Sequence, residues 1–289
     1  MKAGIIGGGK VGCCLAQYFQ QAGVLQGITA AHPEKSMLLA KRFGTELLTN
    51  EKLVQQADIL LLTVPDRLIQ QVAQQLAAAG AEALRGKIFL HCSGSLGTEV
   101  LEPLKEQGSF IGSCHPLQSF VSAATELRGV YMAVDGDAEA LEAAKKIAAL
   151  LGGIPFYVPA KERRLYHAAA CFCSNYVVAA AAIGQQLMAR WVGSEDAAWQ
   201  ALLPLFKGTA ANLQQSASAG SALTGPIARG DCATVSGHLT VLPQEVISAY
   251  CSLGLEAVRL ASANGTIDSE TAQQLVRLLE HPEVEKHDS

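Results

Sequence analysis

A glycine cluster near the amino terminus constrains the fold of this chain more than any other feature. Residues 7–12 read Gly-Gly-Gly-Lys-Val-Gly, and they lie directly between the strand-like run 2–6 and a helix-like segment. In that setting Gly7 permits a tight turn, Gly9 lets the backbone approach a pyrophosphate, and Gly12 allows the helix to pack closely on the strand. The pattern predicts a dinucleotide site, with a purely structural glycine turn as the alternative.

The beginning of the following helix belongs to the same predicted site, because free N–H groups and the helix dipole attract phosphates there. We therefore count Lys10 and Val11 among the cofactor-binding residues, although the Lys10 side chain itself is expected in solvent. Val64 and Pro65 end a later strand, and their backbone is predicted to line the pyrophosphate and the nicotinamide ribose. Asp66 is expected to cap the next helix rather than to contact the ligand.

The choice between NADP and NAD depends on the end of the second strand, about 20 residues past the glycine loop. Residues 30–36 read Ala-Ala-His-Pro-Glu-Lys-Ser, with no acid at the strand end itself. His32, Lys35 and Ser36 are suited to a 2′-phosphate, so the sequence favours NADP. NAD stays possible because Glu34 offers a carboxylate to a ribose diol, and the charged residues here also suit a solvated surface.

The order of elements predicts an α/β protein. Short β-rich runs alternate with amphipathic helical segments, which is typical of a doubly wound, mostly parallel sheet with helices on both faces. The β-rich runs are 2–7, 27–32, 46–49, 58–65, 87–94, 110–116, 130–134 and 155–159. The rest of the chain reads as helices only. We place the boundary near Val158, with a Rossmann-type dinucleotide domain over 1–158 and an all-helical domain over 159–289.

Composition excludes several classes of protein. The chain has 289 residues, 49% of them hydrophobic and 17% charged, with a net charge of −4, so a large core is expected and nucleic acid is not an expected partner. The amino terminus lacks the features of a signal peptide, and no apolar run approaches the length that crosses a bilayer. We expect a cytoplasmic protein with no membrane contact. Its eight cysteines show no zinc spacing, so we predict reduced thiols and no metal site.

Two further strand ends carry side chains suited to proton transfer. The runs 87–94 and 110–116 should end at the same sheet edge as the glycine loop. His115 is the first candidate for moving a proton, since the pKa of histidine lies near working pH. The alternative is a histidine held in the turn before Pro116. Ser93 is suited to hold a substrate or orient that histidine, although a serine at a strand end is often a turn former.

A polar stripe marks the first long helix of the second half. His167, Cys171, Ser174 and Asn175 fall within roughly one third of the circumference of a continuous helix. These groups either satisfy one another in a core or face a cleft. We expect them to face the nicotinamide across the cleft between the domains, with Ser174 in contact with substrate.

Several of these segments together resemble one protein family over nearly the whole chain. They are the glycine loop, TVPD, HCSGSLG, HPLQSF, YHAAACFCSNY and ALTGPIARGD. They are similar to Rossmann-like proteins with a C-terminal domain of unknown function, which are described as NADP-dependent oxidoreductases. Pyrroline-5-carboxylate reductase, 6-phosphogluconate and β-hydroxyacid dehydrogenases and prephenate dehydrogenase are more distantly similar. The resemblance implies a C-terminal domain like that of 6-phosphogluconate dehydrogenase and a homodimer formed through it, but no single substrate.

The resemblance also suggests roles for individual residues. His115 and Pro116 match a His-Pro pair of prephenate dehydrogenases, in which the histidine lies at the reacting hydroxyl. Asn175 matches an asparagine of β-hydroxyacid dehydrogenases, but Cys171 stands where those enzymes have lysine. That departure puts β-hydroxyacid oxidation in doubt. His167 is the candidate to replace the lysine as proton donor.

A glycine-rich loop over residues 222–231 is similar to the loop that holds the substrate carboxylate in pyrroline-5-carboxylate reductases. Thr224, the backbone near Gly225 and Arg229 are thereby predicted to bind an anion. In the alternative, Asp231 caps the next helix and Arg229 pairs with an acid.

These observations predict an NADP-dependent oxidoreductase that acts on a small anionic carbonyl, imine or hydroxy compound. His115 or His167 would carry the proton, while Asn175 and Ser93 would position the reacting group. Imine reduction is a variant that needs less from a general base. The alternative from another class is a non-catalytic sensor or scaffold that binds the dinucleotide, and the absent lysine favours it.

Overall fold

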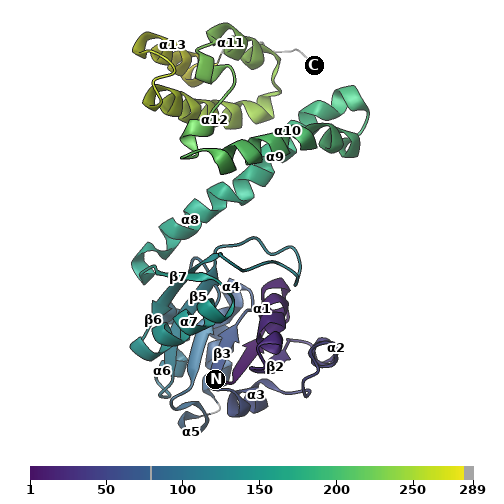
Figure 1. Cartoon of the computed structure of the whole chain (residues 1–289), viewed down its shortest axis with the longest axis vertical. Coiled ribbons are helices and arrows are strands. Elements are labelled where there is room, and N and C mark those ends of the chain that lie inside the picture. Colours follow the sequence, from purple (N-terminus) through teal and green to yellow (C-terminus); the bar gives the residue numbers. More distant parts are fainter. Residues whose placement is uncertain (79, 283–289) are drawn as a thin grey trace. The chain divides into compact units, whose positions relative to one another are not determined.

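A seven-stranded sheet forms the first part of the chain (Figure 1), in a computed structural model that describes residues 1–78 and 80–282. The strand order is β2-β1-β3-β4-β5-β6-β7. Strands β1 to β5 are parallel, β6 is antiparallel to β5, and β7 is parallel to β6, which confirms the predicted α/β class. The strands are β1 (Ala3–Ile6), β2 (Leu25–Thr29), β3 (Ile59–Leu62), β4 (Ile88–His91), β5 (Phe110–Pro116), β6 (Tyr131–Gly136) and β7 (Ile154–Tyr157).

One predicted strand is wrong, because residues 45–49 contain no strand. Leu48 packs its side chain into the core next to Leu53 instead of extending the sheet. Thr49 then caps α3 (Asn50–Gln56), accepting a hydrogen bond of 3.3 Å from the backbone N–H of Lys52. A short apolar run bounded by a threonine therefore serves here as the entry to a helix.

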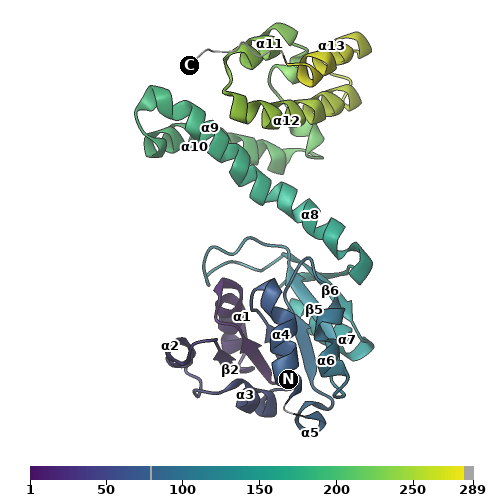
Figure 2. The same ribbon diagram turned by 180° about the vertical axis from the view of Figure 1, so that it is seen from behind.

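Both faces of the sheet are covered by helices, as the sequence predicted. Because strand side chains alternate, Leu61 and Cys114 join the core under α1 and α7, whereas Leu60 and Ile111 join the core on the opposite face. Figure 1 shows α7 across β5 and β6, and Figure 2 shows α4 and α6 from behind. The helices are α1 (Lys10–Gln21), α2 (Pro33–Phe43), α3, α4 (Asp66–Ala77), α5 (Ala81–Leu84), η1 (Thr98–Leu101), α6 (Glu102–Lys105) and α7 (Ala138–Leu150).

The helix that follows the sheet is anchored to it by one buried arginine. After η2 (Ala160–Glu162), α8 (Arg163–Cys173) begins with Arg163, which has no exposed surface. Its guanidinium donates hydrogen bonds to the hydroxyl of Ser113 on β5 and to the carbonyl of Val158, the latter at 3.3 Å. The first compact unit accordingly runs to Tyr176, one helix beyond the boundary expected near Val158.

The long helix predicted after Pro159 is interrupted, so the expectation of one continuous helix is wrong. Ser174 leaves helical geometry with φ −128° and ψ −77°, and its N–H bonds to the carbonyl of Cys171, three residues back instead of four. That change closes the last turn of α8 as a tighter turn, and α9 (Asn175–Val192) begins at the next residue.

The second compact unit, residues 177–289, is helical in its described part, as predicted. Its core forms where α11, α12 and α13 bury Val235, Leu239, Ile247, Val258 and Leu275. The alternative considered for Asp231 is confirmed, because its carboxylate caps α11 by accepting from the Thr234 backbone N–H at 3.0 Å. The elements are α9, α10 (Glu195–Gln215), η3 (Gly220–Ala222), η4 (Ile227–Arg229), α11 (Cys232–Val241), α12 (Gln244–Ala263) and α13 (Ser269–Glu280).

Helices α9 and α10 expose apolar side chains. Val178, Trp191 and Leu205 are 68%, 72% and 69% exposed. The sequence predicted no segment of bilayer-spanning length, whereas the helical stretch Ala160–Val192, which includes the turn at Ser174, and the helix Gln244–Ala263 are long and apolar enough by length and composition alone. An exposed face of this kind typically marks a surface that packs against another molecule.

Candidate functional site

The glycine loop between β1 and α1 has the geometry that its sequence predicts. Gly7 adopts φ +125°, and a Cβ there would lie 2.6 Å from the backbone of Thr63. A Cβ on Gly12 would overlap the carbonyl oxygen of Gly7, so only glycine fits at both positions. Gly9 differs, because the nearest atom to a Cβ there is the Thr63 carbonyl oxygen at 3.9 Å. The backbone at Gly9 therefore faces open space.

The amino end of α1 follows this loop directly. Its first hydrogen bond runs from the Cys13 N–H to the Gly9 carbonyl at 2.9 Å, so the preceding N–H groups of Lys10, Val11 and Gly12 have no partner within the helix. No acidic residue lies in the first turn. The exposed loop therefore presents several backbone donors and positive potential, an arrangement that suits a phosphate group.

The three residues predicted to meet a 2′-phosphate differ in their surroundings. Lys35 extends toward the glycine loop, since its Cε lies 3.4 Å from the place that a Cβ on Gly8 would take. His32 is exposed at the position before α2. Ser36 is buried, and its hydroxyl accepts from the Ala30 N–H at 2.9 Å and contacts the Ala30 carbonyl at 3.2 Å. The Ser36 hydroxyl therefore already closes the turn between β2 and α2.

The connection from β3 to α4 is bonded to the turn after β4 through the carboxylate of Asp66. Val64 is half-buried, and Pro65 is exposed at the position before α4. The predicted capping role of Asp66 is wrong, because Asp66 is the first residue of α4 and makes no capping bond. Its carboxylate instead accepts from the hydroxyls of Ser93 at 2.6 Å and Ser95 at 3.2 Å. The ends of β3 and β4 are thereby tied together.

Ser93 shapes the turn after β4. It is 4% exposed; besides donating to Asp66, its hydroxyl accepts from the N–H groups of Ser95 and Leu96, each at 3.2 Å. A hydroxyl with these three partners has no proton left for a substrate. The structure thus gives Ser93 the geometry of the turn former, and it holds Gly94 in place.

His91 stabilises the same turn as a neutral imidazole. Its Nδ1 accepts from the Ser93 N–H at 3.2 Å, and its Nε2 lies 3.1 Å from the Gly97 carbonyl, to which it donates. The pKa of His91 is lowered to about 4, chiefly by burial and to a smaller extent by the positive charge of Arg163. Both nitrogens are engaged in structural bonds, which leaves His91 outside the chemistry.

A cavity of about 440 Å³ lies at the start of the β5–β6 connection and along α8. It brings together four of the residues predicted to act on substrate: His115, His167, Ser174 and Asn175. Tyr166 and Cys171 also line it. The other lining residues are Leu117, Gln118, Ser119, Ala169, Ala170 and Cys173. None of these described residues is acidic or is a lysine or arginine, so the lining combines apolar surface with neutral polar groups.

Gly94 lies against both histidines of the cavity. A Cβ on Gly94 would come within 2.8 Å of Nε2 of His115 and of Nδ1 of His167. The two imidazole rings meet edge to face, with centroids 6.2 Å apart. Within the described part of the chain, Nδ1 of His167 is buried without a hydrogen-bond partner. Only glycine at position 94 lets the turn after β4 close over these rings.

Tyr166 is the residue of this site that the sequence analysis missed. Its hydroxyl oxygen lies 2.7 Å from Nδ1 of His115, and the two rings meet edge to face with centroids 5.6 Å apart. The only signal in the sequence was its position, directly before His167 and one helical turn after Arg163. A contact across 51 positions in the sequence leaves no local pattern.

The electrostatics of this pair differ from the sequence-based expectation. The pKa of His115 is lowered to about 4, chiefly by burial and to a smaller extent by the charge of Arg163 and the proximity of His167. The expected pKa near working pH is therefore wrong for this environment. Burial also raises the pKa of Tyr166 to about 12. At neutral pH both side chains are uncharged, so His115 acts as a neutral hydrogen-bonding group.

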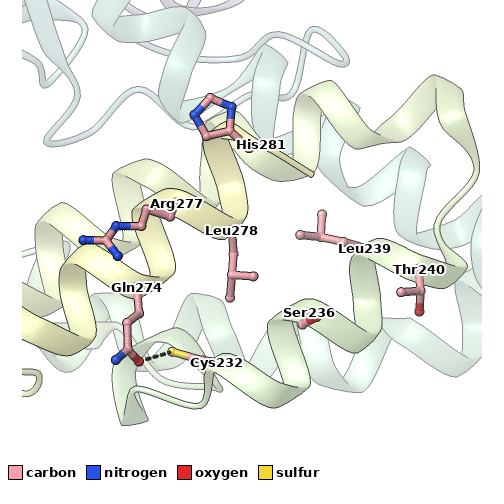
Figure 3. A pocket seen from close by; sticks show the side chains of 8 residues that line it. All are labelled: Cys232, Ser236, Leu239, Thr240, Gln274, Arg277, Leu278 and His281. Atoms are coloured by element: carbon pink, nitrogen blue, oxygen red, sulfur yellow. Dashed lines mark hydrogen bonds between the residues drawn. The ribbon is translucent and has the colours of Figure 1, made fainter. Parts of the chain in front are cut away.

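The two residues predicted to bind an anion lie in the second unit. Thr224 is exposed between η3 and η4, and Arg229 is exposed at the end of η4. Neither lines the cavity described above. A separate cavity of about 530 Å³ between α11 and α13 (Figure 3) is bordered by Cys232, Gln274 and Arg277, and it contains none of the predicted site residues. In the described ranges, no group of histidine, cysteine or acidic side chains is arranged to hold a metal ion.

Comparison with known proteins agrees with this architecture. Residues 1–116 match the Rossmann-like domain, and residues 130–257 match a domain of unknown function, DUF2520. The chain is thus a Rossmann-like protein with a C-terminal domain of unknown function, which confirms the resemblance predicted from its motifs. No curated protein matches it.

Several solved structures share the fold. A Bacteroides fragilis protein named as an NADP oxidoreductase has 21% identity and a TM-score of 0.66, over 82% of this chain and 89% of that one. A Thermotoga maritima protein has 23% identity and a TM-score of 0.63, over 96% and 100%. Pyrroline carboxylate reductase of Plasmodium falciparum with NADP bound has 14% identity and a TM-score of 0.58, over 96% and 98%. At these identities the likeness establishes the fold.

Proposed function

We propose that this protein is an NADP-dependent oxidoreductase that transfers a hydride to or from a small carbonyl, imine or hydroxy compound. The observation that carries the proposal is a row of contacts along the carboxyl edge of the sheet. Thr63 bonds to Gly7 at 2.7 Å, Asp66 bonds to Ser93, and the neighbouring Gly94 lies against His115. The glycine loop and the histidine cavity therefore belong to one edge, where ligands of doubly wound sheets bind.

The glycine loop supplies the features that an NADP pyrophosphate requires. The backbone at Gly9, Lys10 and Val11 would hold the phosphates, and Val64 with Pro65 would line the ribose beside them. Lys35, with His32, offers positive charge to a 2′-phosphate, which is why we favour NADP over NAD. Two of the similar proteins also support this choice, since one is named for NADP and another holds it. When bound, the cofactor supplies the hydride.

In this proposal the cavity holds the reacting group of the substrate. His115 carries the proton, and His167, whose buried Nδ1 has no partner in the described residues, supplies a second hydrogen bond. Ser174 and Asn175 orient the substrate from the junction between α8 and α9. Because the described lining contains no cation, an anionic group of the substrate would need charge from elsewhere. Arg229 and Thr224, in the second unit, stay our candidates for binding an anion.

We further propose a cytoplasmic homodimer in which the exposed apolar face of α9 and α10 is buried between two helical domains. Trp191, which is 72% exposed, is the largest side chain on this face. Light scattering should give twice the chain mass for the wild type, and Trp191→Asp should favour the monomer. Extraction of the wild type only with detergent would instead indicate that these helices contact a membrane.

The test of the enzymatic proposal uses the purified full chain. Fluorescence titration should show tighter binding of NADPH than of NADH, and NADPH absorbance should decrease with at least one member of a panel of carbonyl and imine compounds. The alternative, a non-catalytic dinucleotide sensor or scaffold, predicts tight NADPH binding without oxidation by any panel member. Absence of binding to either dinucleotide would contradict both functions.

A further inference from the structure

The contact between Tyr166 and His115 is one of two contacts that align α8 with β5. On β5, Ser113 and His115 point to the same face because they are two residues apart. On α8, Arg163 and Tyr166 lie one turn apart on one side of the helix. Arg163 bonds to Ser113, and Tyr166 meets His115 at 2.7 Å. Two paired contacts thus fix the position of the Tyr166 hydroxyl along β5.

The ring of Tyr166 is also held from behind. Phe156 on β7 packs against it edge to face, with centroids 5.8 Å apart, and Phe156 in turn packs on Tyr131 of β6 at 5.9 Å. These aromatic contacts come from β6, which is next to β5 in the sheet, and from β7, which follows β6. They restrict the ring to the orientation in which its hydroxyl faces Nδ1 of His115, because edge-to-face pairs favour defined geometry.

The chemistry of the pair assigns the proton between them. A phenol O–H is a stronger acid than the N–H of neutral imidazole, and an imidazole nitrogen is a stronger base than a phenol oxygen. The favoured arrangement therefore has Tyr166 donating to Nδ1 of His115. The remaining ring proton of His115 then resides on Nε2, the nitrogen at the edge of Gly94.

We propose that Tyr166 is a positioning residue that holds His115 as the Nε2–H tautomer and replaces the proton that His115 gives to the substrate. This role rests on the proposed reductase function. Tyr166 acts through His115, which is the group that touches the reacting atom. The site would then use a tyrosine–histidine pair in place of a protonated histidine.

The proton transfers balance as follows for reduction of a carbonyl. The carbonyl carbon would take the hydride that bound NADPH supplies, leaving NADP⁺, while the carbonyl oxygen takes the proton from Nε2 of His115. The Tyr166 hydroxyl gives its proton to Nδ1 of the same ring, so His115 stays neutral and Tyr166 becomes a phenolate. The Nδ1 proton then returns to the Tyr166 oxygen while solvent gives a proton to Nε2, which restores the starting tautomer. The substrate gains one hydride and one proton, and becomes an alcohol.

The charge of Arg163 acts on both groups of the pair. Its buried positive charge opposes a second positive charge on His115 and stabilises negative charge on Tyr166. With the pKa of His115 at about 4, roughly one molecule in a thousand would carry imidazolium at neutral pH. Because His115 stays neutral while it donates its proton, this route does not require the imidazolium form.

The first test measures the tautomer directly and needs no substrate. Nitrogen-15 spectra of histidine-labelled protein at about pH 7 should show His115 protonated on Nε2 in the wild type. Tyr166→Phe should convert this signal to a mixture of tautomers, whereas Tyr157→Phe should leave it unchanged, since Tyr157 is 60% exposed and lies outside the pair. Protonation of wild-type His115 on Nδ1, or an unaltered signal in Tyr166→Phe, would overturn the proposal.

The second test measures turnover with the same variants. Tyr166→Phe should lower kcat for NADPH oxidation by about 10²-fold to 10⁴-fold while the Kd for NADPH stays unchanged. Tyr157→Phe should match the wild type in both. Unchanged kcat in Tyr166→Phe would refute the proton-supplying role. If the wild type oxidises NADPH with no panel compound, the enzymatic proposal fails, and the tautomer measurement still decides the arrangement of the pair.

Discussion

Arg163 donates a hydrogen bond to the hydroxyl of Ser113 from a position with no exposed surface. A second bond reaches the Val158 carbonyl, and Asp135 on β6 provides the largest compensating charge. Burying a guanidinium is costly unless it is bonded and compensated, so the contact requires α8 to start at one place on the sheet. The same contact places Tyr166 and His167 beside His115.

Replacing this arginine should alter both stability and the titration of the site. Arg163→Met removes the bonds to Ser113 and Val158 and should lower the free energy of unfolding by about 1–3 kcal/mol. It should also raise the pKa of His115 toward 6.5, without reaching it, because burial is the larger cause of the shift. Urea unfolding and histidine NMR titration measure the two effects. Arg164→Met, at the exposed neighbouring position, should change neither.

The turn after β4 should tolerate no side chain at Gly94. Gly94→Ala places a methyl group within 2.8 Å of both imidazoles, and the tie between His115 and Tyr166 limits how far the rings can move. We expect a loss of about 1–3 kcal/mol in unfolding free energy together with a large loss of turnover. Gly237→Ala, in open space on α11, is the matched control and should be neutral or stabilising. Wild-type activity in Gly94→Ala would show that the two rings need not stay at their present positions.

The glycine loop allows a test of cofactor binding that is independent of turnover. Gly12→Ala places its Cβ against the carbonyl oxygen of Gly7, so the backbone of the loop must shift. The Kd for NADPH, measured by fluorescence titration, should rise by at least about tenfold if the loop holds the pyrophosphate. Gly208→Ala on α10, where a Cβ meets nothing within 4 Å, should bind as the wild type does. Equal affinities for the two variants would place the dinucleotide elsewhere.

Stability should fall in mildly acidic solution because His91 is buried in its neutral form. Its pKa in the folded protein is about 4 against 6.5 in the unfolded chain, so below pH 6.5 the unfolded state binds the extra proton. The contribution is complete above pH 6.5 and is lost as pH falls to about 4. Such a shift corresponds to roughly 3 kcal/mol. Urea unfolding across this range should show a steeper decrease for the wild type than for His91→Gln, and parallel curves would contradict the assignment.

The parts that the sequence predicted correctly are those with a local physical cause. The glycine loop is recognisable because Gly7, Gly9 and Gly12 are required by backbone geometry within six residues. The sheet is recognisable because strands buried on both faces are continuous apolar runs, such as residues 59–62. The strand predicted over residues 46–49 is wrong, because a run of this length and composition also suits a loop that leads into a helix.

Predictions for polar side chains depended on partners that are distant in the sequence. Ser93 and Asp66 bond to each other across 27 positions, so neither serves as the isolated ligand or cap that its local sequence suggested. Of the predicted polar stripe, His167, Ser174 and Asn175 line one cavity with His115, and their position toward a nicotinamide stays a prediction. The partner of His115 could not be found from periodicity, because Tyr166 reaches it only through the packing of α8 on β5.

The preference for NADP can be examined at Lys35, whose side chain extends toward the glycine loop. If its ammonium group meets a 2′-phosphate, Lys35→Met should weaken NADPH binding by about tenfold to a hundredfold and leave NADH binding nearly unchanged. Lys41→Met, an exposed residue in the last turn of the same helix, controls for a general loss of positive charge. A similar loss for both cofactors in Lys35→Met would mean that Lys35 meets the shared pyrophosphate. No loss for either would leave His32 as the remaining basic group at this strand end, and His32→Ala would then be expected to carry the selectivity.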